Sequence, residues 1–232
     1  MNHFVIPARA RPWLPVVGQD GRFPIHRIYC VGRNFADHAR EMGASVERGT
    51  PMLFCKPADA VLPGGGRQSY PSATAQLHHE VELVVALGKD ADGVIALEHA
   101  NDYIFGHAVG LDLTRRDLQA AAKAKGQPWD LAKGFDRSAP TSAIVPIGHA
   151  VPAVDARLWL EVNGESRQSA PLSDMIFSVP EVLVALSQYF ELRAGDLVFM
   201  GTPAGVGPLL PGDHYEAGIE GFAHLSGHIT AA

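Results

Sequence analysis

The run Glu80-Val-Glu-Leu-Val-Val-Ala-Leu-Gly88 constrains the fold of this 232-residue chain more than any other segment. In an extended strand, successive side chains point to opposite faces, so the run divides into two sets. One face carries Val81, Leu83, Val85 and Leu87, and the other carries Glu80, Glu82, Val84 and Ala86. The run therefore predicts a β-strand that brings two carboxylates to one face.

The two carboxylates of this strand can be explained by a shared cation. Residues two apart along a strand are separated by roughly 6.5–7 Å, so Glu80 and Glu82 project side by side. Like charges this close repel, and one of them tends to take up a proton. A shared divalent metal removes the repulsion, and carboxylate ligands suit a hard cation such as Mg²⁺ or Mn²⁺. A lone Glu-x-Glu is more often a solvated strand end, so the metal interpretation depends on the surrounding sequence.

A third acid, Asp112, follows the apolar stretch 105–111, which predicts a buried strand. Asp112 can cap the helix that residues 117–125 suggest. At the end of a strand beside the Glu-x-Glu strand, it can instead complete an all-carboxylate metal site, with water and substrate in the other positions. Both interpretations stay open at this stage.

A second group of chemically useful residues follows a short predicted strand at 27–31. Asn34 is predicted as a helix N-cap and Gly43 as the stop of the same helix. On that helix His38 and Glu41 are three residues apart, so their side chains can form a hydrogen bond. A histidine oriented by a carboxylate is a suitable general base near neutral pH. The alternative is an ordinary surface pair.

Together with these residues, several motifs in a fixed order make the chain resemble the fumarylacetoacetate hydrolase family. The resemblance is to its short single-domain branch of acylpyruvases and fumarylpyruvate hydrolases. The matching segments are 29–41, 54–57, 78–83, 110–119, 126–136, 162–165, 175–177, 195–196 and 201–207. Each motif alone is weakly specific, but the whole set, in this order from about Pro24 to the C-terminus, is specific for the family.

The resemblance implies a mixed α/β fold that is mainly β, in which a rolled mixed sheet with a few short helices holds the metal. It implies metal ligation by Glu80, Glu82 and Asp112, and a His38–Glu41 dyad on a segment that closes over substrate. It also implies that Lys133 reaches the reacting oxygen. Candidate substrate-binding residues are Arg33, Arg116, Gln119 and Thr202. The family usually has Ala where this chain has Arg115, so we expect an altered pocket rim.

For function, the resemblance implies metal-dependent hydrolysis of a carbon–carbon bond in a β-diketo acid. Fumarylpyruvate, cleaved to fumarate and pyruvate in aromatic-compound degradation, is the best candidate. Mg²⁺ is the expected cofactor, with Mn²⁺ as an alternative and Ca²⁺ as a substitute. Decarboxylation of oxaloacetate, or isomerisation and decarboxylation of 2-hydroxyhepta-2,4-diene-1,7-dioate, needs the same metal site. A non-catalytic metal-binding β domain leaves the dyad and Lys133 unexplained, and a non-haem iron oxygenase calls for two histidines.

Composition fits a compact enzyme and excludes other classes. The length suits one domain, which we divide into an N-terminal arm or edge hairpin at 1–23 and a catalytic domain at 24–232. The net charge of −6 without a basic cluster argues against nucleic acid as a partner. Cys30 and Cys55 are predicted as reduced core residues, which favours a cytoplasmic location. Neither a membrane span nor a signal peptide is predicted, and the resemblance implies a homodimer.

Local signals predict three further elements in the C-terminal half. Asn163-Gly164 predicts a type I′ hairpin between strands at 158–162 and 165–168. Ser178, followed by Pro180 and by Glu181 at the third helical position, predicts the start of a helix that runs to Tyr189. Residues 197–200 predict a buried strand.

Overall fold

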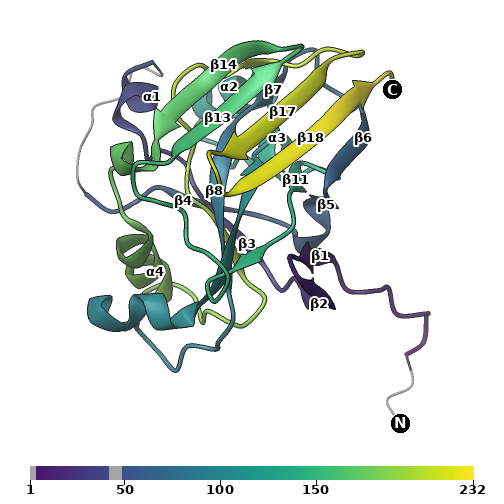
Figure 1. The fold of residues 1–232 in the computed structure, drawn as a ribbon. Coiled ribbons are helices and arrows are strands. Elements are labelled where there is room, and N and C mark those ends of the chain that lie inside the picture. Colours follow the sequence, from purple (N-terminus) through teal and green to yellow (C-terminus); the bar gives the residue numbers. More distant parts are fainter. Residues whose placement is uncertain (1–3, 42–48) are drawn as a thin grey trace.

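The computed structural model describes residues 4–41 and 49–232, and its fold is mainly β with short helices (Figure 1). The larger sheet runs, in spatial order, through β4 (Leu53–Lys56), β3 (Ile28–Val31), β15 (Leu197–Phe199), β8 (Val81–Leu87), β9 (Ile104–Leu111), β11 (Ala139–Thr141) and β5 (Val61–Pro63), with β12 (Val145–Pro146) paired to β9. Strand β15 pairs parallel with β3 but antiparallel with β8. The predicted mixed sheet is confirmed.

A second sheet lies across β8 in Figure 1. Its spatial order is β14 (Glu165–Pro171), β13 (Arg157–Val162), β17 (His214–Ile219), β18 (Ala223–Thr230) and β6 (Gly65–Ser69). A small sheet consists of β10 (Thr114–Arg115), β7 (Leu77–His79) and β16 (Gly207–Pro208). The small sheet leads directly into β8, so it lies at the end of β8 that carries the acidic residues.

Strand β8 is buried on both faces, as a strand at the centre of a two-layer fold must be. Val81, Leu83, Val85 and Leu87 belong to the apolar cluster that also contains the inner residues of β13, β17 and β18. Val84 and Ala86 belong to a separate cluster on the other side of the sheet. The predicted division of this strand into two faces is therefore confirmed, and each face has its own core.

The N-terminal segment forms a hairpin of β1 (Trp13–Val16) and β2 (Gln19–Pro24), the second of the two forms that its sequence allowed. Leu14 is fully buried in the cluster on the second face of β8. The amide of Val17 donates to Ile144 O at 2.9 Å, and the amide of Ile144 donates to Pro15 O at 2.9 Å. The hairpin thus packs against the larger sheet, while the domain division at residue 24 stays a prediction.

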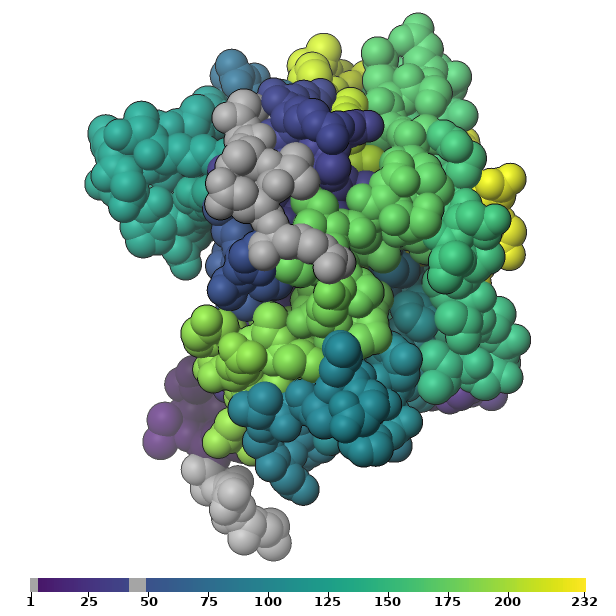
Figure 2. Space-filling view, turned by 90° about the vertical axis from the view of Figure 1, so that its left-hand side faces the viewer, coloured from purple at the N-terminus to yellow at the C-terminus, as the bar shows by residue number. Residues whose placement is uncertain are grey.

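The helices are short: α1 (Ala36–Glu41), α2 (Arg116–Ala124), α3 (Asp130–Lys133) and α4 (Val179–Ser187), with 3₁₀ turns η1 (Ala58–Ala60), η2 (Leu97–Tyr103) and η3 (Leu172–Asp174). Helix α4 begins with the predicted capping box of Ser178 and Glu181. The region around α2 (teal) projects from the body of the molecule in Figure 2. None of the helices in the described ranges is long and apolar enough to cross a lipid bilayer.

Three local predictions need comment. The hairpin turn is confirmed, because Asn163 and Gly164 have φ of 54° and 78°, as a type I′ turn requires. Asn34 does not cap α1; its side chain is buried and donates to Met200 O at 2.8 Å, which ties two distant segments together. Gly43, the predicted helix stop, lies outside the described residues.

The cysteine prediction is half wrong. Cys30 is buried in β3 as expected, whereas Cys55 is exposed, and both are free thiols. The reason is the place of β4 at the edge of the larger sheet, where one side of the strand faces outward. An apolar run in the sequence did not reveal that its strand lies at an edge.

Candidate active site

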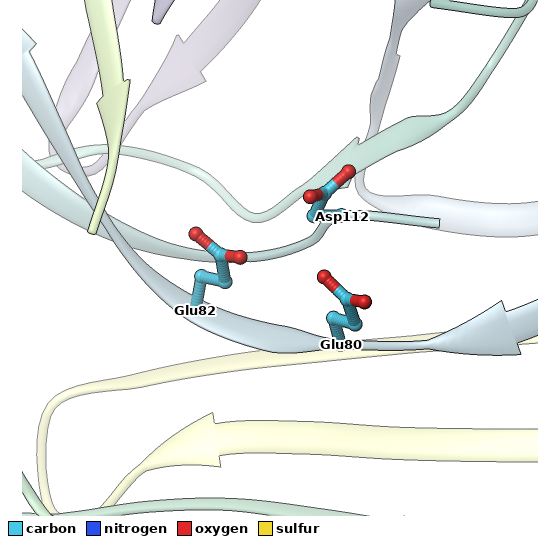
Figure 3. A group of neighbouring side chains, drawn as sticks. All are labelled: Glu80, Glu82 and Asp112. Carbon is cyan, nitrogen blue, oxygen red and sulfur yellow. The ribbon is translucent and has the colours of Figure 1, made fainter. Parts of the chain in front are cut away.

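Two adjacent strands bring the three predicted carboxylates together (Figure 3). Glu82 lies in β8, Glu80 directly precedes this strand, and Asp112 directly follows β9. Strands β8 and β9 are antiparallel, and the amide of Asp112 donates to Glu80 O at 2.8 Å. This register places the end of β9 beside the start of β8. Asp112 does not cap a helix, because α2 begins four residues later with Arg115 at its N-cap position.

The triad has the geometry and chemistry of a hard-cation site. Each residue offers a carboxylate oxygen, and these oxygens lie within 4.8 Å of one another. Bonds of about 2.0–2.4 Å from a cation to oxygen allow opposite ligands to be up to about 4.8 Å apart. The residues are 5%, 1% and 1% exposed for Glu80, Glu82 and Asp112, so bulk water does not compensate their charge. The donor set therefore fits a divalent metal ion.

Three cationic side chains surround the triad. Lys133 Nζ lies 2.7 Å from Glu80 Oε2 and also contacts Asp112. Lys56 Nζ lies 2.8 Å from Asp112 Oδ1, and Arg116 contacts Glu80. When all three acids are ionised, their charges balance those of the three cations. A divalent ion would add two positive charges, which favours a substrate with negative charge.

The positive charges are unevenly shared within the triad. Burial would raise the pKa of Glu80, but the charges of Lys133 and Arg116 outweigh it and hold that pKa well below its ordinary value. For Glu82, burial and then the charges of Asp112 and Glu80 raise the pKa well above its ordinary value. Burial would lower the pKa of Lys133, yet Asp112 and Glu80 raise it. Glu82 thus needs a metal to stay ionised more than Glu80 does.

The predicted dyad forms on α1. His38 Nδ1 lies 3.3 Å from Glu41 Oε2, and His38 is buried while Glu41 is exposed. The same carboxylate accepts hydrogen bonds from the backbone amide of Gly205 at 3.2 and 3.3 Å. Burial lowers the pKa of His38, so its imidazole is neutral at neutral pH. With Nδ1 directed at the carboxylate, Nε2 is the nitrogen that can accept a proton.

Two of the predicted substrate-binding residues lie on α2. Arg116 Nη1 donates to Gln119 Oε1 at 2.5 Å, and Gln119 is buried. Through its contact with Glu80, Arg116 joins this pair to the triad. Arg33 is half-buried, and with the described residues it forms neither a hydrogen bond nor an ion pair to the triad.

Thr202 is buried, and its hydroxyl oxygen accepts a hydrogen bond from Gln168 Nε2 at 2.7 Å. Arg115 lies beside the site without joining it: its guanidinium packs over the Phe135 ring at 4.5 Å and donates to Leu131 O at 3.1 Å. A cavity of about 370 Å³ reaches Lys133 between β4 and the 127–130 segment. Lys133 is the candidate site residue that lines this cavity.

Sequence reasoning missed Lys56, Gln168 and the backbone amides of Gly201 and Gly205, which lie at the two ends of residues 201–205, a segment that we call the site loop. Lys56 is fully buried against the triad, and the amide of Gly201 donates to Glu82 Oε2 at 2.7 Å. The signal for Lys56 was a lysine at the end of the apolar run Leu53-Phe54-Cys55, where a charge is expensive unless it is paired. Backbone donors leave no comparable trace in a sequence.

A rolled mixed sheet that holds three converging carboxylates beside a His–Glu pair defines a metal-dependent enzyme site. Residues 27–230 match the family described as fumarylacetoacetate (FAA) hydrolase C-terminal, and the chain belongs to this family. The chain is similar to a fumarylpyruvate hydrolase from Pseudomonas aeruginosa, whose structure was solved in complex with Mn²⁺ and pyruvate. That structure is 44% identical with a TM-score of 0.96, and the match covers 99% of this chain and 100% of the other.

Other relatives differ in the reaction that their names state. The mitochondrial oxaloacetate tautomerase FAHD1 of Mus musculus is 47% identical over 198 residues, or 85% of this chain and 89% of the relative. The structure of a 2-hydroxyhepta-2,4-diene-1,7-dioate isomerase from Mycobacterium marinum is 31% identical with a TM-score of 0.77. The match covers 89% of this chain and 75% of the isomerase chain. The chain is thus similar to proteins whose names state different reactions.

Proposed function

We propose that this protein hydrolyses the carbon–carbon bond of an acylpyruvate, with fumarylpyruvate as the best candidate, and releases pyruvate and a carboxylic acid. The observation that carries the proposal is the buried His38, whose Nδ1 faces Glu41 and whose Nε2 makes no hydrogen bond to the residues that the structure describes, so that it can take a proton from water. Hydrolysis needs such a base, whereas simple decarboxylation does not. The likeness to a fumarylpyruvate hydrolase over nearly the whole chain supports the same reaction.

The triad would hold the metal, with Mg²⁺ as the expected ion and Mn²⁺ as an alternative. When bound, the ion would supply Lewis-acid polarisation of the substrate's keto and enol oxygens. The neutral balance of the triad and its three cations favours a dianionic substrate once a divalent ion is added. Fumarylpyruvate and oxaloacetate both satisfy this condition, because each has two carboxylates.

The chain's own residues account for the remaining steps. Arg116 and Gln119, on the α2 side of the triad, would bind a carboxylate of the substrate, with Arg33 as a further candidate. His38 would take a proton from water, and the resulting hydroxide would add to the carbonyl distant from the pyruvate half. Lys133 and Thr202 would donate to the developing oxyanions. Cleavage then leaves a carboxylic acid and the enolate of pyruvate, which takes up a proton.

Oxaloacetate tautomerisation is the second candidate, supported by the identity of 47% to a tautomerase named for that reaction. It moves a proton between carbon and oxygen without water or bond cleavage, so the same His–Glu pair can serve as acid and base. Oxaloacetate decarboxylation and the isomerisation and decarboxylation of 2-hydroxyhepta-2,4-diene-1,7-dioate use the same enolate and remain alternatives.

One panel of assays separates these reactions. Purified protein is stripped with EDTA and assayed with and without Mg²⁺ or Mn²⁺ on fumarylpyruvate, acetylpyruvate and oxaloacetate. Hydrolysis is measured as pyruvate release with loss of the β-diketo absorbance, and tautomerisation as the decay of enol-oxaloacetate without pyruvate. We expect metal-dependent pyruvate release from fumarylpyruvate, abolished by Glu82→Gln. Faster conversion of enol-oxaloacetate with no acylpyruvate cleavage would refute the hydrolase and support the tautomerase.

A further inference from the structure

Gln168 occupies an unusual place in the fold. It is 1% exposed, while the other residues of β14 are half-buried or exposed. Leu160 pairs with Gln168 and Glu161 pairs with Ser166, so Arg167 is an extra residue that forms a β-bulge. A bulge bends a strand and re-aims the side chain next to it. Here it turns an amide side chain into the interior of the site.

The four hydrogen bonds of this amide fix its orientation. Gln168 Oε1 accepts from the backbone amide of Val81 at 3.1 Å, and Nε2 donates to Pro203 O at 2.8 Å. A backbone N–H can only donate and a carbonyl can only accept, so the amide cannot be flipped. His79 Nδ1 therefore donates to Oε1 at 2.9 Å, and Thr202 Oγ1 must accept from Nε2 at 2.7 Å.

This orientation decides the direction of the Thr202 hydroxyl bond. Because the oxygen already accepts from Gln168, its proton is available for a different acceptor. Within the described ranges the hydroxyl makes no hydrogen bond besides the one from Gln168. A substrate oxygen in the site would be that acceptor, so Gln168 makes Thr202 a donor.

The site loop that Gln168 holds also contacts both halves of the candidate machinery. The amide of Gly201 donates to Glu82, and the amide of Gly205 donates to Glu41. Both glycines have positive φ, 90° and 93°. A Cβ on Gly205 would lie 2.0 Å from Arg167 O, so this end of the loop rests directly on the bulge. The loop therefore connects a metal-ligand candidate to the dyad.

We propose that Gln168 is a positioning residue for the reaction. It fixes the site loop so that Thr202 donates to the substrate while Gly205 holds the Glu41 carboxylate beside His38. This inference rests on the proposed function, in which Thr202 and the dyad act on the substrate. Gln168 keeps the site loop ordered whichever reaction takes place there.

Gln168→Glu tests the proposal with little change in shape, because it retains an acceptor for Val81 and His79 but loses the donor toward Thr202 and Pro203. Loss of such a supporting contact lowers activity by about 10–100-fold, and we expect this loss in kcat for acylpyruvate hydrolysis. KM should change by less than about threefold, because the defect is in the transition state. Gln68→Glu is the matched control: Gln68 is also buried and donates to Arg137 O at 2.8 Å, away from the site loop.

A double-mutant cycle distinguishes positioning from loss of structure. If Gln168 acts through Thr202, adding Thr202→Val to Gln168→Glu should cost little more than the larger single loss. If the loss of activity in the double variant equals the product of the two single losses, Gln168 has an independent structural role and the proposal is overturned. Gln168→Met carries no charge and provides the same comparison if the glutamate variant does not fold.

Amide hydrogen exchange at Gly201, Thr202, Ala204 and Gly205, the residues of the site loop that have a backbone N–H, provides a test that needs no activity. We expect faster exchange of this segment in Gln168→Glu than in the parent or in Gln68→Glu, with no change in β8. Unchanged exchange in the loop would overturn the inference even if activity falls. Failure of the parent to cleave any acylpyruvate would refute the proposed function instead, and the exchange comparison would still decide the role of Gln168 in the loop.

Discussion

Replacing Lys56 by Met should show how strongly the cationic residues support the triad. The Lys56 side chain is 0% exposed, and its Nζ lies 2.8 Å from Asp112 Oδ1. It also donates to Ser138 Oγ at 3.0 Å, to Leu113 O at 3.3 Å and to Lys133 O. Methionine has a similar unbranched shape, so the substitution removes the charge and its donors with little change in volume.

The expected cost follows from these contacts. Removing one partner of a buried ion pair leaves the other charge uncompensated and costs about 3–5 kcal/mol. Asp112 retains its contact with Lys133, so we expect a loss near the lower limit, about 3 kcal/mol. A domain of this size has about 5–15 kcal/mol of total stability, so the variant should remain folded in buffer.

Urea unfolding of the metal-stripped protein measures this loss, and the same titration in excess Mn²⁺ tests its cause. A bound divalent ion would replace the missing positive charge, so Mn²⁺ should stabilise the variant more than it stabilises the parent. Lys89→Met is the control, because Lys89 is exposed, and we expect its effect to be within about 0.5 kcal/mol. A loss below about 1 kcal/mol without metal, or a loss that Mn²⁺ leaves unchanged while it stabilises the parent, would refute the reasoning.

Three more predictions concern the dyad, pH and assembly. His38→Ala and Glu41→Gln should each reduce acylpyruvate hydrolysis by about 10²–10⁴-fold, the usual effect of losing a general base. Any oxaloacetate decarboxylation should fall much less. Equal losses in both rates would contradict the roles assigned to this pair. Burial lowers the pKa of His107 to about 4, so the folded state binds fewer protons at this residue than the unfolded state does. The contribution of His107 to the free energy of unfolding should therefore be fully present above pH about 6.5 and be lost as the pH falls toward 4. His107→Leu should remove up to about 3 kcal/mol of this loss in urea titrations at pH 7 and pH 4, and an unchanged pH dependence would contradict it. From the family resemblance we expect a homodimer, so light scattering should give twice the chain mass of 24.8 kDa, and a monomer at micromolar concentration would count against it.

Local patterns in the sequence determined the elements whose signals lie within a few residues. The alternation in 80–88 predicted a strand with two faces, and the structure places those faces in two different apolar clusters. Asn163-Gly164 predicted its hairpin, and Ser178 with Glu181 predicted the start of α4. Each signal depends on backbone preferences or on side chains one to three residues apart, which a single sequence displays directly.

The ordered motifs also predicted the family and the three residues of the triad. The local sequence around each of these residues, however, left its role open. Asp112 could be a helix cap or a ligand, and the pairing of β8 with β9 decided between these by placing it beside Glu80. The same applies to Asn34, which a local pattern assigned to α1 and which instead joins segments that are 143 and 166 residues away.

Only the tertiary structure decided which residues surround the triad and the dyad. Lys56 finds Asp112 across 56 residues of chain, and Gln168 finds His79 across 89. The outward side of Cys55 follows from the edge position of β4. Strand order, register and one bulge fix these contacts, and they depend on the packing of the whole chain. A sequence records the residue types that can carry charge or donate a proton, whereas folding determines which charge faces which donor.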